Sequence, residues 1–130
     1  MNYLDKPFFK LNGKNLTPEI LHKLGNKEYY LDLDAESWGR VRKSEGIVNQ
    51  IVKSHEKVYG ITTGFGFFSD VLISTREILE LQKNIIRSHS SGVGKAISID
   101  MVRIMLVLRI NVLAKGHSGL RFLNTNFKIV

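Results

Sequence analysis

Helix-capping residues and apolar residues at helical spacing predict four helices along the chain. The first helix is expected over residues 18–25. Thr17 is placed as its N-cap, Pro18 takes the first helical position, and Glu19 lies in the first turn, where a negative charge is favourable. Gly25 is expected to end the helix.

A short extended stretch, residues 28–33, separates the first helix from the second. Asp34 is predicted to cap the second helix, which should run to about Lys53. Five positions recur at helical spacing, and four of them are apolar: Trp38, Val41, Glu45, Val48 and Val52. The pattern therefore predicts a helix with one apolar face.

The helical period stops at residues 58–66, which read VYGITTGFG and are rich in glycine. Glycine permits backbone angles closed to other residues, so this stretch is predicted to be a tight loop. A third helix is expected to start at Ser74, where Glu77 completes a capping box, and to end before the glycines at 92 and 94. Its predicted inward stripe is Ile78, Leu81 and Ile85, flanked by Leu79 and Ile86.

The fourth predicted helix begins near Ser98 and is apolar on nearly every side over residues 101–114. Gly116 is placed as the first residue after its C-cap. A helix that is apolar all round is normally buried all round, yet this chain offers just three other helices to cover it. The mismatch indicates a helix made for a larger assembly.

Together these elements predict a mainly α protein of one unit over residues 1–130, with a short extended piece near its start. Cysteine is absent, which excludes disulfides and thiol catalysis and fits a cytoplasmic location. The apolar stretch at 101–114 is too short and too charged to cross a bilayer. We therefore expect no membrane association.

The net charge of +7 raises the question of an anionic or nucleic-acid partner. The basic residues are spread along the chain and are not interleaved with aromatic residues, so a solvated surface explains them and no nucleic-acid binding is expected. The four histidines are far apart in sequence, which predicts no metal site. The sequence around Lys95 does not match the motif of a phosphate-binding loop, because Ala96 occupies the position where that motif has serine or threonine.

Three long motifs resemble the aromatic amino acid ammonia-lyases, in the order and at the distances found there. They are YGITTGFG at 59–66, LQKNIIRSHSSGVG at 81–94 and LRINVLAKG at 108–116. The segment LNGKNLT at 11–17 is similar to the opening strand and turn of the same family. The sequences of these motifs are most similar to those of the histidine ammonia-lyases. This resemblance implies the N-terminal part of the L-aspartase-like helical fold of that family.

The resemblance implies elimination of ammonia from L-histidine to give trans-urocanate, the first step of histidine breakdown, in a homotetramer. It implies that Tyr59 is the catalytic base that removes a β-proton, on an active-site loop that includes Gly60, Thr63, Gly64, Phe65 and Gly66. It also implies that His89 binds the imidazole of the substrate; the alternative is a helix-end histidine that interacts with the last carbonyls of its helix. A free tyrosine has a pKa of about 10, so a base at this position would need nearby positive potential.

Members of the family carry an electrophilic methylidene-imidazolone (MIO) group made from an Ala-Ser-Gly triad, and no such triad occurs in these 130 residues. We therefore expect the MIO group not to form in this chain and the chain alone to be inactive. Residues 123–130 lack a helical period and are interpreted as a divergent tail. Two alternatives stay open: a non-catalytic fragment that docks on full-length lyase subunits, and a tyrosine or phenylalanine ammonia-lyase fragment.

Overall fold

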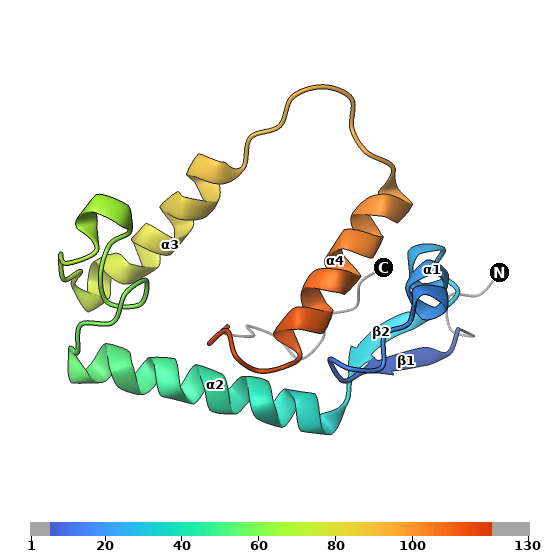
Figure 1. The fold of residues 1–130 in the computed structure, drawn as a ribbon, viewed down its shortest axis with the longest axis horizontal. Helices are drawn as coiled ribbons and strands as arrows, with labels where there is room; N and C mark the ends of the chain where they lie inside the picture. The colour runs from blue at the N-terminus through green and yellow to red at the C-terminus, as the bar shows by residue number, and fades with distance from the viewer. Residues whose placement is uncertain (1–5, 121–130) are drawn as a thin grey trace. The chain divides into compact units, whose positions relative to one another are not determined.

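The computed structural model describes residues 6–120, with the element order β1, α1, β2, α2, η1, α3 and α4 (Figure 1). The contacts divide the chain into two compact units. The first unit combines Met1–Glu45 with Ala96–Val130, and the second is Gly46–Lys95. The divergent tail predicted at residues 123–130 lies outside the described residues.

The first unit opens with two parallel strands joined by a helix. β1 (Phe8–Leu11) pairs with β2 (Tyr30–Leu33) in a register that places Phe8 opposite Tyr30 and Leu11 opposite Leu33. Parallel strands need a crossover connection, and α1 (Pro18–Gly25) supplies it. The extended stretch predicted at 28–33 is confirmed for residues 30–33.

The cap predicted for α1 is confirmed, since the Thr17 hydroxyl accepts a hydrogen bond from the Ile20 amide at 3.3 Å. Gly25 is the last helical residue, and its role is close packing. A Cβ there would lie 2.7 Å from Cγ1 of Ile104 on α4 (Ile99–Leu113). Arg103, also on α4, donates to the Gly25 carbonyl at 2.6 Å. The end of α1 is therefore held directly against α4.

α2 (Ala35–Ser54) begins and ends within one residue of its predicted bounds. Asp34 accepts a hydrogen bond from the Ser37 amide at 2.7 Å, which confirms the predicted cap. Hydrogen bonds from the Ser37 side chain and amide lower the pKa of the Asp34 carboxyl below its ordinary value. The charged form that caps the helix is therefore favoured.

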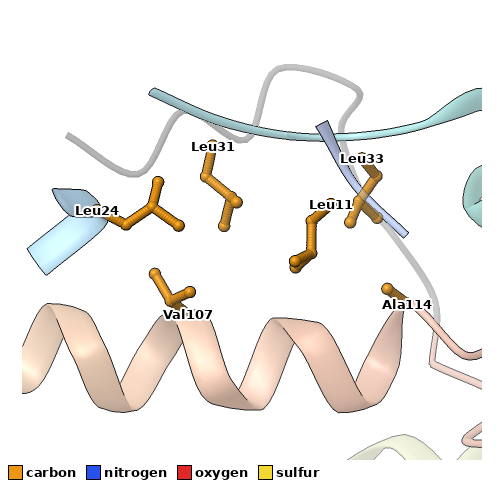
Figure 2. Close-up of a cluster of buried hydrophobic side chains, with 6 residues drawn as sticks. All are labelled: Leu11, Leu24, Leu31, Leu33, Val107 and Ala114. Carbon is orange, nitrogen blue, oxygen red and sulfur yellow. The ribbon is translucent and has the colours of Figure 1, made fainter. Parts of the chain in front are cut away.

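The core of the first unit lies between the two strands, α1 and α4 (Figure 2). Its buried apolar side chains are Leu11, Leu24, Leu31, Leu33, Val107 and Ala114. α4 starts after Ser98, as predicted, but it does not have the buried environment that an all-apolar helix calls for. Several of its large apolar side chains are exposed: Ile99, Met101, Met105, Leu106, Leu108 and Val112.

The end of α4 differs by one residue from the prediction. Ala114 is the C-cap, so Gly116 is the second residue beyond it and not the first. Gly116 has a φ of +76° and lies so close to α2 that a Cβ would stand 2.6 Å from Cβ of Arg40. The turn after α4 therefore packs tightly on the first part of α2.

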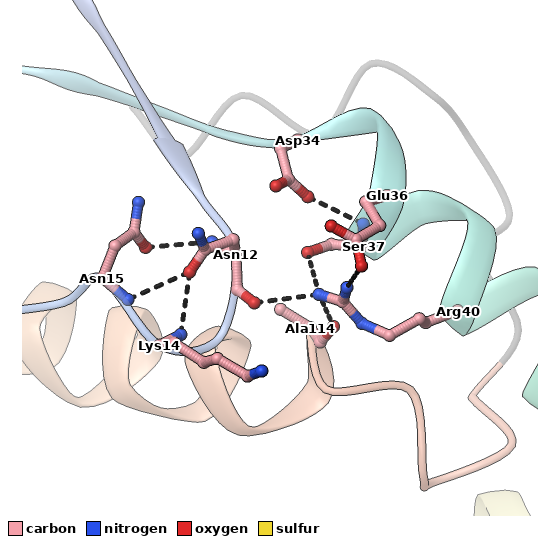
Figure 3. Close-up of polar contacts among 8 residues, drawn as sticks. All are labelled: Asn12, Lys14, Asn15, Asp34, Glu36, Ser37, Arg40 and Ala114. Atoms are coloured by element: carbon pink, nitrogen blue, oxygen red, sulfur yellow. Dashed lines mark hydrogen bonds and ion pairs between the residues drawn. The ribbon is translucent and has the colours of Figure 1, made fainter.

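Arg40 joins three segments of the first unit (Figure 3). Its Nη2 donates to the Asn12 carbonyl at 2.9 Å, to the Ser37 hydroxyl at 2.7 Å and to the Ala114 carbonyl at 3.3 Å. Its Nη1 lies 2.9 Å from the Glu36 carboxylate. We call Arg40 and these partners the Arg40 clamp.

The second unit contains the last part of α2, the glycine-rich loop, the short 3-10 helix η1 (Gly66–Phe68) and α3 (Thr75–His89). Ser74 is the N-cap of α3, as predicted, but the prediction of a capping box is wrong, because the side chain of Ser74 makes no cap hydrogen bond. The Ser74 hydroxyl donates to the Glu77 carboxylate at 2.5 Å and makes no bond to a helix amide. The predicted inward stripe is confirmed, because Ile78, Leu81 and Ile85 are half-buried whereas Leu79 and Ile86 are exposed.

Candidate active site

The loop that carries Tyr59 is built around the buried side chain of Thr62, which is 3% exposed. The Thr62 hydroxyl accepts from the Val58 amide at 2.9 Å and donates to the Glu56 carbonyl at 2.5 Å. The amides of Ile61 and Thr62 both donate to the Val58 carbonyl at 3.0 Å. These bonds close a tight turn over residues 58–62 and fix the backbone on both sides of Tyr59.

The second half of the loop is pinned to the segment that precedes α3. Thr63 forms an isolated antiparallel bridge with Leu72. The Gly64 amide donates to the Val71 carbonyl at 3.2 Å, and the Ile73 amide donates to the Thr62 carbonyl at 2.9 Å. Because α3 begins two residues after Ile73, the loop is anchored to the N-terminal end of that helix.

At two positions of the loop the structure explains why the residue is a glycine. A Cβ on Gly64 would lie 2.7 Å from Cβ of Phe68 and 2.9 Å from the Phe68 carbonyl oxygen, so a side chain does not fit. Gly60 has a φ of +75°, a conformation that is costly for residues with a side chain. It directly follows Tyr59 and therefore sets the direction in which the chain leaves that residue.

Tyr59 is 63% exposed, and its ring packs edge-on against Phe65 with the ring centroids 5.9 Å apart. An edge-to-face pair of this kind restricts the ring without covering the hydroxyl. Phe65 is itself 40% exposed. The loop thus presents a phenol that is supported on one side and open to a ligand.

The C-terminal end of α3 gathers polar side chains around its last carbonyls. The hydroxyl of Ser88 donates to the Ile85 carbonyl at 3.0 Å, and that of Ser90 donates to the Ile86 carbonyl at 2.5 Å. The Nδ1 atom of His89 lies 2.8 Å from the Ile85 carbonyl oxygen. Side chains at the end of a helix commonly form hydrogen bonds with the carbonyls of its last turns.

The other ring nitrogen of His89, Nε2, makes no hydrogen bond within residues 6–120. His89 is exposed, so this nitrogen is open to solvent or to a ligand. The motif containing Ser88 was visible in the sequence, but its contact with the His89 ring was not predicted. The available signal is a serine three residues after Ile85, at the point where a helix ends.

The described structure does not bring Tyr59 and His89 into contact. The loop is anchored before the first residue of α3, and His89 is the last residue of that helix. No hydrogen bond or ring contact among residues 6–120 links the two predicted residues.

Other kinds of site find no support in the described part of the chain. No three histidine, aspartate or glutamate side chains of residues 6–120 are grouped so that they could hold a metal ion. Among the same residues, no helix has the length and apolar character needed to cross a membrane. The candidate site residues Tyr59 and His89 both belong to the second unit.

Comparison with known proteins decides the family. The sequence profile of the family described as "Aromatic amino acid lyase" matches residues 16–126, which includes the tyrosine loop, α3 and α4. The chain belongs to the aromatic amino acid lyases. The resemblance read from the three motifs is thereby confirmed.

Individual relatives agree with this assignment. The histidine ammonia-lyase of Homo sapiens is 48% identical over 113 residues, which cover 87% of this chain and 17% of that protein. The crystal structure of histidine ammonia-lyase from Trypanosoma cruzi matches with a TM-score of 0.81 and 40% identity, over 88% of this chain and 22% of that one. The tyrosine aminomutase of Streptomyces globisporus matches with a TM-score of 0.79 and 34% identity, over 89% and 22% of the two chains.

The structural matches confirm the predicted fold class, a mainly α chain that corresponds to part of the ammonia-lyase helical fold. This lyase chain spans about a fifth of the length of the relatives it matches. The activity and substrate of the whole enzymes therefore enter below as proposals for this chain.

The residues of this lyase chain do not fit the formation of an MIO group. The strings nearest to Ala-Ser-Gly are Ser90-Ser91-Gly92 and His117-Ser118-Gly119, and both lack the alanine. The first of them is exposed, and Ser90 is engaged as a cap of α3. In the second, the Gly119 amide donates to the Ser44 hydroxyl at 2.8 Å. These 130 residues therefore do not supply the electrophile of the family.

Proposed function

We propose that this chain provides the tyrosine loop and the imidazole-binding histidine of a histidine ammonia-lyase, which eliminates ammonia from L-histidine to give trans-urocanate. The observation that carries the proposal is the 48% identity to a histidine ammonia-lyase across 87% of the chain. The 40% identity to a second histidine ammonia-lyase, against 34% to a tyrosine aminomutase, favours histidine over tyrosine.

Tyr59 acts as the base in this proposal. Its phenolate oxygen takes a proton from the β-carbon of the substrate, and the electron pair of that C–H bond forms the new Cα–Cβ double bond as the amine leaves. The exposed hydroxyl of Tyr59 and the ring support from Phe65 suit a base that must reach a bound ligand.

His89 holds the substrate side chain. Its free Nε2 offers one hydrogen bond to an imidazole ring, which fixes that ring relative to the reacting carbons. An α-amine is a poor leaving group, and the electrophile that activates it in the family needs the triad that these residues lack. The purified chain alone is therefore expected to form no urocanate.

A chimeric enzyme tests the proposal. Residues 10–120 replace the corresponding segment of an intact histidine ammonia-lyase, and formation of urocanate is followed in a host without its own lyase. The chimera is expected to be active on L-histidine. Tyr59→Phe in the chimera keeps the contact with Phe65 but removes the base, so kcat should fall by about 10²- to 10⁴-fold.

Substrate and fold are controlled in the same experiment. L-tyrosine and L-phenylalanine are supplied in parallel, and faster elimination from either would assign the chain to that branch of the family. Lys53→Arg is a conservative change at an exposed position on α2, outside both the loop and α3, so it should leave kcat unchanged. A chimera that is folded but inactive on all three amino acids would refute the proposal.

A second candidate function is that of a non-catalytic fragment that docks on full-length lyase subunits. The exposed apolar residues of α4 favour it, because apolar surface of this extent is normally covered by protein. Co-expression of the tagged chain with an intact lyase should then give co-purification and a change in lyase activity. If the two proteins separate and the activity is unaltered, this candidate is excluded.

A further inference from the structure

The hydrogen bonds of His89 determine which of its ring nitrogens carries the proton. Nδ1 lies 2.8 Å from the carbonyl oxygen of Ile85. A carbonyl oxygen can only accept a hydrogen bond, so Nδ1 must be the donor and must carry the hydrogen. A neutral imidazole has a single N–H, and Nε2 is then left with an unshared electron pair.

Ser88 is compatible with the same answer. When its hydroxyl donates to the Ile85 carbonyl at 3.0 Å, an oxygen lone pair is left to accept from His89 Nδ1, also at 3.0 Å. If Nδ1 were unprotonated, two lone pairs would face each other across the 2.8 Å between Nδ1 and the Ile85 oxygen. The arrangement of the three groups is therefore consistent with one tautomer.

We infer that the end of α3 holds His89 in the Nδ1–H tautomer, so that its Nε2 is presented as a hydrogen-bond acceptor for an N–H group of the substrate ring. This inference rests on the proposed function for the identity of the ligand. It makes Ile85, through its carbonyl, a positioning residue for His89. An imidazole side chain supplies the required N–H, whereas the phenyl ring of phenylalanine has no donor to offer.

The chemical consequence is selection by an unpaired acceptor. A site that presents an acceptor to its ligand disfavours an analogue without a donor, because the acceptor then loses its bond to water and gains none. The free imidazole ring in water favours the Nε2–H tautomer, which would present a donor instead. The carbonyl of Ile85 thus changes the role of His89 Nε2 from hydrogen-bond donor to hydrogen-bond acceptor.

Nuclear magnetic resonance of the chain labelled with ¹⁵N-histidine tests the inference directly. Spectra are recorded near pH 8.5, where an ordinary imidazole with a pKa of about 6.5 is neutral. The His89 signals are assigned by their loss in His89→Gln, and His117→Gln serves as the matched control that must leave them in place. His89 is expected to show a protonated Nδ1 and an unprotonated Nε2.

A second variant separates the two partners of Nδ1. Ser88→Ala removes the hydroxyl but leaves the Ile85 carbonyl, so His89 should remain in the Nδ1–H form. The inference is overturned if wild-type His89 is mainly in the Nε2–H form. It is equally overturned if Ser88→Ala converts the ring to that form while the helical circular dichroism is unchanged, because the serine and not the helix end would then hold it.

The tautomer of His89 measured by nuclear magnetic resonance does not depend on lyase activity. A chimera inactive on histidine, combined with a protonated Nδ1 in the chain, would refute the proposed function and leave the tautomer assignment standing. An active chimera combined with a protonated Nε2 would do the reverse. The two results therefore distinguish failure of the inference from failure of the function on which it rests.

Discussion

Single residues decide the shape of the tyrosine loop because the backbone passes very close to itself there. Gly64 faces the Phe68 side chain and carbonyl at distances below any ordinary Cβ contact, and the bridge between Thr63 and Leu72 holds the two strands of the loop in place. The backbone that carries Tyr59 is fixed as well, since the neighbouring turn is closed by Thr62.

The first prediction compares two glycines. Gly64→Ala forces a methyl group against the Phe68 carbonyl, and the free energy of unfolding should fall by about 1–3 kcal/mol. Gly39→Ala is the matched control, because nothing lies within 4 Å of a Cβ there and the site is inside α2. Its helix propensity should raise the stability by about 0.5–1 kcal/mol, as measured by urea denaturation. Equal effects of both substitutions would contradict the packing argument.

At the scale of elements, the Arg40 clamp fastens the start of α2 to the turn after β1 and to the end of α4. The ion pair with Glu36 adds little by itself, because the Glu36 side chain is 83% exposed and such pairs are screened by water. The bonds to the Asn12 and Ala114 carbonyls matter more, since they satisfy backbone groups between elements that are distant in sequence.

Two substitutions separate these contributions. Arg40→Met keeps much of the apolar stem but removes every hydrogen bond of the clamp, and it should cost about 1.5–3 kcal/mol of unfolding free energy. Glu36→Gln removes just the exposed ion pair and should cost less than about 1 kcal/mol. Thermal and urea denaturation of the two variants measure the difference. If Glu36→Gln proves the more damaging, the clamp works through the ion pair and our ranking is wrong.

The elements that could be predicted from the sequence are those fixed by neighbouring residues. Thr17 and Asp34 each cap the helix that follows with a hydrogen bond to its first turn, because an N-cap acts within one turn. Ser98 also marks a helix start, but its side chain makes no cap hydrogen bond. At Ser74 the same rule located the helix start but not the bonding, since the hydroxyl found the Glu77 carboxylate in place of an amide.

Contacts across large sequence distances could not be predicted in this way. The parallel pairing of β1 with β2 and the bond from Arg40 to Ala114, 74 residues apart, depend on the tertiary fold. For the candidate site, the motifs supplied Tyr59 and His89 through the resemblance. The position of His89 at a helix end also predicted, as an alternative, a contact with the last carbonyls. The structure shows this contact at Ile85, although the sequence did not indicate which carbonyl is involved.

At the scale of the whole molecule, much apolar side-chain surface is left open. Met105 and Leu106 on α4 are 56% and 49% exposed, and Phe67 on η1 is 96% exposed. The side-chain oxygen of Asn111 is buried without a hydrogen bond among the described residues, which is normally costly. Both features point to contacts with further protein.

The last prediction concerns self-association. The purified chain should sediment as species larger than a monomer, with an average mass that rises with concentration, because exposed apolar surface drives association. Met105→Glu and Leu106→Glu should shift the distribution toward monomer without loss of helical circular dichroism. Gln50→Glu, an exposed change on α2, is the control and should have no effect. A wild-type chain that stays monomeric throughout would contradict the prediction.

The division of the chain into units also determines the order in which it can fold during synthesis. Residues 46–95 form one unbroken segment, whereas the first unit needs Val107 and Ala114 from beyond that segment to cover Leu24 and Leu31. At 5–20 residues per second, a ribosome takes roughly 3–12 s to make the stretch between Glu45 and Val107. During that interval the nascent strands have no α4 to cover them, so they are natural clients of a ribosome-associated chaperone.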